Sequence, residues 1–261
     1  MRNIKLTIEY AGTGFHGWQI QEARSLPGNS KTPRKLRTVQ GELEKTLQKI
    51  LNEPIRLIGS GRTDSGVHAL GQVANFKTRS KLTVDQILKA TNARLPEDIA
   101  VLAVEEVRAD FHAQYRARSK VYRYTILNRQ AKCALSYRFC LWYPHSLNLT
   151  RMRREAKALI GKKDFKSFQC ADPSRGAQRA ADTIRTIKRL TIKRRNDFID
   201  IDIEADGFLY KMVRSIVGSL LEVGRGAAAH GHFKKILQKR DRRVCGQTVP
   251  AKGLCLLAVH Y

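Results

Sequence analysis

The stretch "IRLIGSGRTDSGVHALGQVANFKT" (55–78) holds two short strand patterns on either side of a glycine-rich loop. "IRLIGS" (55–60) leads directly into the loop and "GQVANFKT" (71–78) follows it. Both have the length and apolar content of a strand. The loop contains one carboxylate, Asp64, among small residues. Gly, Asp and Ser are ordinary turn residues, but glycine also lets a catalytic backbone approach a substrate. The loop by itself fits both interpretations.

The segments around this stretch follow the order β-α-β-β-α-β. Apolar residues alternate over 4–10, which predicts a half-buried strand. Residues 38–51 place their apolar side chains on one face of a helix that begins with a capping threonine. Thr83 and Gln86 have the spacing of a capping box, and 99–107 is a further strand. This order is that of the ferredoxin-like split unit.

A similar order recurs in the rest of the chain. The expected elements are strands at 120–127, 183–193, 198–205 and 253–259, helices at 150–161 and 208–224, and a short helix with Phe233, Ile236 and Leu237. The sequence therefore predicts an α+β chain of two halves, 1–109 and 110–261. We expect the two ferredoxin-like halves to join into one extended antiparallel sheet with helices on one face. The active-site cleft would lie between the halves.

The composition points to a polyanionic partner. The chain has 49 Lys and Arg against 23 Asp and Glu, a formal net charge of +26. Nucleic acid is the leading candidate for a folded chain with such an excess. No signal-peptide pattern or long apolar run occurs, so we expect a cytoplasmic protein that does not enter a membrane. The five cysteines are odd in number and form no C-x-x-C pair, which indicates neither a disulfide framework nor a zinc site.

Three further side chains are candidates for the site of Asp64. Arg62 lies in the same loop, and Arg214 interrupts the most apolar helical pattern. A charge there is costly unless it is paired or faces a cleft, although its head group could also reach water. Tyr122 lies among cations in "YRARSKVYRYTIL" (115–127). Aromatic rings beside cations can bind an unstacked base and its phosphates, but tyrosine is also common in ordinary strands.

These segments together resemble a known family. "GRTDSGVHALGQV" (61–73) is similar to the catalytic motif of the TruA-type tRNA pseudouridine synthases, whose pattern is G-R-T-D-x-G-V-H. The other matching segments, in family order, are "EYAGTGFHGWQ" (9–19), "DFHAQYRARSKVYRY" (110–124), "DFKSFQ" (164–169), "GFLYKMVRSIVGSLLEVG" (207–224) and "GLCLLAVHY" (253–261). A lone T-D-x-G would be weak, whereas the full set spans nearly the whole chain.

The resemblance implies an activity and roles for four residues. The family isomerises uridines 38, 39 and 40 of the tRNA anticodon arm, as a homodimer without cofactor or metal. Asp64 matches the catalytic aspartate and Tyr122 the tyrosine that packs against the target uracil. Arg62 matches the arginine that helps to extrude the base, and Arg214 the basic partner of the aspartate. Residues 22–37 form a longer basic loop than the family usually has, and we expect it to change RNA contacts without loss of activity.

The mechanism stays open in one respect, and two other functions are conceivable. Asp64 could attack C1′ or C6 or remove a ribose proton, and Tyr122 is a candidate for the final deprotonation. An aspartic protease also carries Asp-Ser-Gly, but it needs two such aspartates and this chain has no second one. A non-catalytic RNA-binding or chaperone protein would use the basic surface alone, and the presence of Asp64, Tyr122 and Arg214 argues against it.

Overall fold

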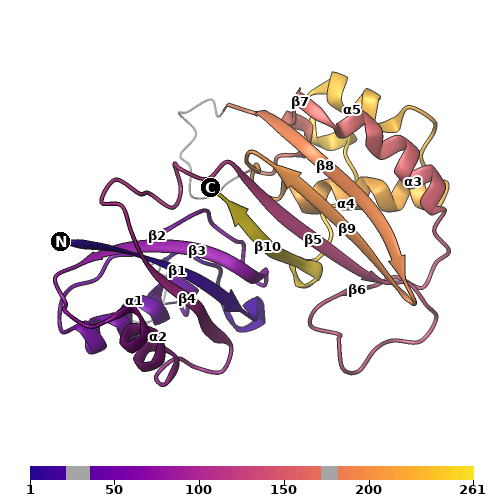
Figure 1. Cartoon of the computed structure of the whole chain (residues 1–261). Helices are drawn as coiled ribbons and strands as arrows, with labels where there is room; N and C mark the ends of the chain where they lie inside the picture. Colours follow the sequence, from indigo (N-terminus) through magenta and orange to yellow (C-terminus); the bar gives the residue numbers. More distant parts are fainter. Residues whose placement is uncertain (22–35, 172–181) are drawn as a thin grey trace, which may run out of the picture. The chain divides into compact units, whose positions relative to one another are not determined.

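The computed structural model describes residues 1–21, 36–171 and 182–261, and within them the chain forms two compact units (Figure 1). The first unit is Met1–Ala117 with Leu256–Tyr261, and the second is Arg118–Cys255. These bounds differ from those of the expected halves, because residues 110–117 and the end of the chain contact the first unit. The Tyr261 hydroxyl, for example, donates to the Ala113 carbonyl at 2.9 Å. Most of the basic loop expected at 22–37 lies outside the described residues.

The first unit has the predicted order β-α-β-β-α-β, which is confirmed. Its elements are β1 (Arg2–Tyr10), α1 (Val39–Leu51), β2 (Ile58–Gly59), β3 (His68–Thr78), α2 (Val84–Asn92) and β4 (Ile99–Val107). The strand order is β4-β1-β3, with β2 antiparallel on β3 and the last residues of β10 (Leu254–His260) beside β3. The helix α2 packs on β4, and α1 packs on α2. The strand β2 is shorter than the expected strand at 55–60.

Local chemistry explains the first unit. Along β1, Ile4, Leu6 and Ile8 are fully buried, while the residues between them face the other side. The Thr38 hydroxyl accepts from the Gly41 N–H and starts α1. The predicted capping box of α2 is confirmed, with both of its reciprocal hydrogen bonds present. Each cap satisfies backbone donors that a helix start leaves without partners.

The second unit is a sheet with a layer of helices. Its elements are β5 (Ser119–Leu127), β6 (Leu141–Trp142), α3 (Leu149–Ala156), β7 (Gly161–Asp164), β8 (Ile184–Arg195), β9 (Phe198–Ala205), α4 (Met212–Gly224), α5 (His232–Lys239) and the start of β10. The strand order is β5-β9-β8-β7, all antiparallel, and β6 is parallel to β5. The helices α4 and α5 both contact α3. The α+β class is confirmed. How the two units pack on one another, and the cleft expected there, stays a prediction.

Two expected helices are shorter in the structure. The helix expected over 150–161 ends at Ala156. A single 3₁₀ turn follows, and the backbone is already extended at Ile160, before β7 begins at Gly161. The strand β7 was missed because "GKKD" carries no apolar alternation. The helix expected from 208 begins at Met212, because Lys211 has a left-handed backbone with φ of +59°.

The core of the second unit forms between α4 and the sheet. Met212, Ile216 and Leu220 on α4 are fully buried, as are Ile201 and Ile203 on β9. Burial of each such side chain stabilises the fold by about 1.5–3 kcal/mol. Across the described ranges, no helix is long and apolar enough to cross a membrane.

One buried carboxylate joins α3 to the start of α5. Glu155 on α3 is only 4% exposed. It accepts from the Gly231 N–H at 3.0 Å and lies 2.8 Å from Nδ1 of His230. Burial opposes ionisation of Glu155, but these two contacts outweigh it and hold its pKa below the usual value. The carboxylate therefore fixes the backbone at which α5 begins.

We expect Glu155→Gln to lower the free energy of unfolding by about 1–3 kcal/mol, because it weakens a buried, charge-assisted network. Urea unfolding at neutral pH measures this. Asp197→Asn is the control, since Asp197 forms an exposed ion pair with Arg129 that is worth at most about 1 kcal/mol. Equal losses in the two variants would contradict the role of Glu155.

The same contact predicts a pH dependence of stability. A carboxylate whose pKa is lowered by folding stabilises the protein above its unfolded pKa, and that stabilisation is lost as the pH falls through the folded value. The wild-type protein should therefore lose stability below about pH 4.5 more steeply than Glu155→Gln. Parallel curves of unfolding free energy against pH would show that Glu155 does not titrate in this way.

Candidate active site

The loop that carries Asp64, called the aspartate loop here (residues 61–67), connects β2 to β3 in the first unit. The Asp64 carbonyl accepts from the Val67 N–H at 3.1 Å, and Gly66 has a φ of +79°. The loop is thus a real tight turn. Arg62 in this turn is exposed and Asp64 is half-buried. Turn chemistry and the presentation of a carboxylate occur in the same residues, so the two interpretations of the sequence are compatible.

The aspartate loop rests on a second segment, the glycine turn (residues 12–18), which follows β1. The Trp18 N–H donates to the Thr63 carbonyl at 3.1 Å. The Phe15 carbonyl accepts from the Gly66 N–H at 3.4 Å and from the Ser65 hydroxyl at 3.1 Å. These bonds connect the residues on both sides of Asp64 to the glycine turn.

Two glycines allow this close approach. A Cβ on Gly12 would lie 1.9 Å from the Val67 carbonyl oxygen, and one on Gly17, where φ is +96°, would lie 2.7 Å from the Thr63 carbonyl oxygen. No other residue fits at these distances. The Gly12 N–H also donates to Nδ1 of His68 at 3.0 Å. His68 is buried, and this bond gives it a structural part in holding the glycine turn.

A buried hydrogen bond anchors the residue before Asp64. The Tyr10 hydroxyl and the Thr63 hydroxyl are 2.8 Å apart, and both residues are buried. The last residue of β1 therefore anchors the aspartate loop through Thr63. The sequence analysis missed Thr63 and Gly12; the spacing of the glycines in "AGTGFHGW" (11–18) was the available signal.

Tyr122 lies on β5 in the second unit. It is 8% exposed, and its ring packs edge-on against Phe208 at 5.0 Å between centroids. Arg123, on the opposite side of the strand, forms a two-pronged ion pair with Asp202 at 2.7 and 2.9 Å. The expected alternation of tyrosines and arginine along β5 is therefore present.

Arg214 lies in the first turn of α4 and is half-buried among apolar neighbours. Its Nε donates to the Val249 carbonyl at 2.8 Å. The next carbonyl, that of Pro250, accepts from the Tyr124 hydroxyl at 2.8 Å. Burial raises the pKa of Tyr124 far above its usual value, so this hydroxyl stays a donor. Val249 and Pro250 thus connect Arg214 to the strand that carries Tyr122.

The four predicted site residues form two groups. Asp64 and Arg62 share the aspartate loop of the first unit, and Tyr122 and Arg214 share the β5–α4 region of the second. Arg62 and Asp64 are two residues apart in one loop, and Val249 and Pro250 connect Arg214 to the strand of Tyr122. A pairing of Asp64 with Arg214 stays a prediction.

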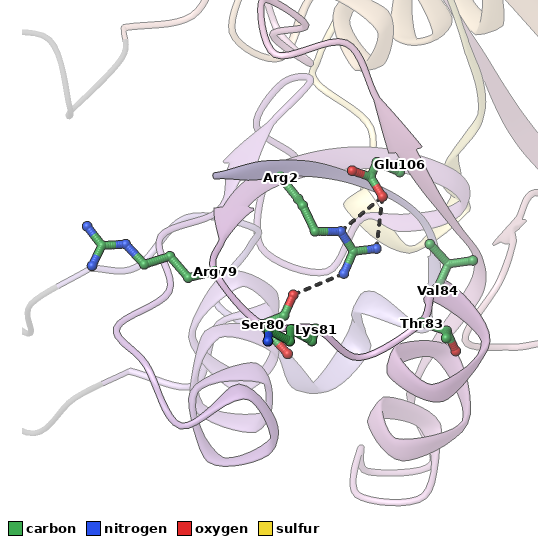
Figure 2. A pocket seen from close by; sticks show the side chains of 7 residues that line it. All are labelled: Arg2, Arg79, Ser80, Lys81, Thr83, Val84 and Glu106. Carbon is green, nitrogen blue, oxygen red and sulfur yellow. Dashed lines mark hydrogen bonds and ion pairs between the residues drawn. The ribbon is translucent and has the colours of Figure 1, made fainter.

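A surface pocket of the first unit lies apart from these residues. Figure 2 shows its lining, which consists of Arg2, Arg79, Ser80, Lys81, Thr83, Val84 and Glu106. The Arg2 guanidinium donates to Glu106 at 2.9 Å and to the Ser80 carbonyl at 3.0 Å. Arg2 therefore connects β1 to β4 and to the segment that precedes α2. Within the described ranges, no three His, Cys, Asp or Glu side chains gather where they could hold a metal ion.

We expect Gly12→Ala to lower the free energy of unfolding by at least about 1–3 kcal/mol, because the added methyl group overlaps the Val67 carbonyl. Gly207→Ala is the matched control. Its Cβ would meet only the Arg185 side chain, at 3.3 Å, and that side chain can move. Urea unfolding of both variants measures the difference. A Gly12→Ala variant as stable as Gly207→Ala would show that the close approach is dispensable.

Comparison with known proteins shows the family of the chain. Residues 7–116 and 156–261 match the family model described as tRNA pseudouridine synthase. The tRNA pseudouridine synthase A of Thermoanaerobacter sp. (strain X514) is 42% identical over 261 residues, which cover 100% of both chains. The enzyme of the same name from Caldicellulosiruptor bescii is 43% identical with the same coverage. That of Geobacillus kaustophilus (strain HTA426) is 40% identical over 100% of this chain and 95% of its own. The chain thus belongs to the tRNA pseudouridine synthase family.

Proposed function

We propose that this isomerase converts uridine to pseudouridine at positions 38, 39 and 40 of the tRNA anticodon stem-loop, with Asp64 as the catalytic carboxylate. The proposal rests on the hydrogen bonds that attach the aspartate loop to the glycine turn. It holds Asp64 half-buried at a tight turn whose backbone is bonded on both sides to the glycine turn. A carboxylate held in one place meets the first requirement of nucleophilic catalysis.

The reaction depends chiefly on the correct placement of the target uridine against the reacting carboxylate. The N1–C1′ bond breaks, the uracil turns, and a C5–C1′ bond forms, after which C5 loses its proton and N1 gains one. No electron leaves the substrate, so atoms and charge balance within one nucleotide. The target base has to be extruded from its stack before Asp64 can reach it. Asp64 can attack C1′ or C6, or remove a ribose proton.

The other three residues receive supporting roles. Tyr122, which is buried against Phe208, would pack on the extruded uracil and assist the final deprotonation. Arg214, which is oriented by the Val249 carbonyl, would pair with Asp64 and keep it ionised. The exposed Arg62 would help to extrude the base. As in the family that the sequence resembles, we propose a cytoplasmic homodimer that needs no cofactor.

The positive charge is unevenly divided between the units. Residues 118–255 hold 31 Lys and Arg against 11 Asp and Glu, a net charge of +20, whereas the first unit holds 18 against 12 and has +6. The strand β8 alone carries six cations and no acid. We therefore propose that the second unit supplies most of the contacts to tRNA phosphates.

We expect Asp64→Asn to abolish catalysis, with a loss of at least about 1000-fold, because the amide is no nucleophile. Tritium release from tRNA labelled at uracil C5 measures the rate, and a filter-binding assay measures tRNA affinity. Asp110→Asn is the control, since Asp110 is an aspartate of the same unit in ion pairs with Arg108 and Arg116. Affinity should change less than about threefold in both variants.

Three results would contradict the proposal. Release by Asp64→Asn at the wild-type rate would remove Asp64 from the mechanism. Tight tRNA binding without release by the wild-type protein would favour a non-catalytic RNA-binding protein. Release only from uridines outside positions 38–40 would correct the substrate.

We expect tRNA affinity to fall with salt, with a log–log slope of about −0.7 to −0.9 for each phosphate contacted. Replacing Lys188, Lys193 and Arg194 on β8 with Gln should reduce this slope by up to about three. Replacing three exposed lysines of the first unit, Lys45, Lys49 and Lys77, with Gln is the matched control. A larger change in the control would place the phosphate contacts in the first unit instead.

A further inference from the structure

The position of the aspartate loop depends on the glycine turn, and the glycine turn depends in turn on Arg37. The Arg37 carbonyl accepts from the His16 N–H at 2.9 Å. Its guanidinium lies 4.1 Å above the centre of the Phe15 ring. Phe15 is buried, and its carbonyl is the acceptor for both Ser65 and Gly66. Arg37 therefore contacts the residue that bonds directly to the aspartate loop.

Arg37 is itself fixed by Asp98, the residue just before β4. The two guanidinium nitrogens Nη1 and Nη2 donate to the two carboxylate oxygens, each at 2.7 Å. This fork fixes both the position and the plane of the guanidinium. Hydrogen bonding to Asp98 also raises the pKa of Arg37. The Asp98 carbonyl accepts from the Ala11 N–H at 3.0 Å, so Asp98 holds the start of the glycine turn as well.

We propose that Arg37 and Asp98 are positioning residues for catalysis, which set the place of the Asp64 carboxylate through Phe15 and the glycine turn. This inference rests on the proposed role of Asp64 as the catalytic carboxylate. Four segments meet in the arrangement: the glycine turn, the residue before the Thr38 cap of α1, the aspartate loop, and the residue before β4. A change at Asp98 thus reaches Asp64 without touching the substrate.

The effects of this ion pair on stability and on the reaction rate are expected to differ in size. The side chains of Arg37 and Asp98 are 36% and 30% exposed, and an ion pair at that exposure contributes at most about 1 kcal/mol to stability. A displacement of about 1 Å at a reacting group, by contrast, can lower the rate about 100-fold. A positioning pair should therefore affect the chemical step far more than the stability.

The test compares Asp98→Asn with Glu106→Gln. Asp98→Asn keeps the shape of the side chain and leaves every cation in place for RNA. Glu106 forms an arginine–carboxylate pair of the same unit with Arg2 (Figure 2), and Arg2 otherwise donates to the carbonyls of Ser80 and Leu82, away from the glycine turn and the aspartate loop. Each variant is measured for single-turnover tritium release at saturating enzyme, for tRNA affinity and for thermal stability.

We expect Asp98→Asn to lower the single-turnover rate about 10- to 100-fold. Its tRNA affinity should stay within about threefold of the wild-type value, and its melting temperature should match that of Glu106→Gln. Arg37→Lys should show the same rate loss, because lysine cannot form the two-pronged pair. A wild-type rate in Asp98→Asn would overturn the inference, and so would a rate loss matched by an equal loss in Glu106→Gln.

Hydrogen exchange separates this inference from the proposed function. If Asp64→Asn is inactive and Asp98→Asn is fully active, the proposed function holds and the inference fails. If the wild-type protein releases no tritium, the proposed function fails, and exchange of the amides at 61–67 decides the inference. Faster exchange there in Asp98→Asn than in Glu106→Gln would support the positioning role, and equal exchange would refute it.

Discussion

The backbone contact between the glycine turn and the aspartate loop is the constraint on which the site depends. Two carbonyl groups of the loop lie where a Cβ on Gly12 or Gly17 would have to be. A side chain at either position would push the loop away, so glycine is required for steric reasons. The contact places Asp64 at a defined distance from the end of β1, and the buried Tyr10–Thr63 hydrogen bond maintains it.

Around this contact lie two buried groups and one partly exposed ion pair. The buried Tyr10 and Thr63 hydroxyls bond to one another, the buried Phe15 bonds to the loop through its carbonyl, and the partly exposed Arg37–Asp98 pair contacts the Phe15 ring through Arg37. Each of these contacts fixes part of the backbone that carries or supports the aspartate loop. These contacts restrict the backbone on both sides of the half-buried Asp64, as the role proposed for its carboxylate requires.

The second unit combines an apolar core with most of the positive charge. It contains Tyr122 and Arg214 and has a net charge of +20, out of +26 for the whole chain. The Val249 and Pro250 carbonyls bind Arg214 and Tyr124, so the apolar helix α4 can carry a cation without leaving it unsatisfied. The many cations of β8 lie on a strand whose partner β9 supplies the buried apolar face. Charge and core are thus separated within one sheet.

Sequence patterns determined the α+β class, the order of elements in the first half, both helix caps and the loop that carries Asp64, because period and capping chemistry act over a few residues. They failed at β7, at the end of α3, after which the backbone becomes extended at Ile160, and at the start of α4, where Lys211 has a left-handed backbone. Only the tertiary structure decided that Tyr10 bonds to Thr63, that the Phe15 carbonyl accepts from Ser65 and Gly66, and that Arg37 and Asp98 contact the glycine turn. These residues are far apart in the chain, and their contacts depend on backbone approach and hydrogen-bond geometry, which no local pattern records.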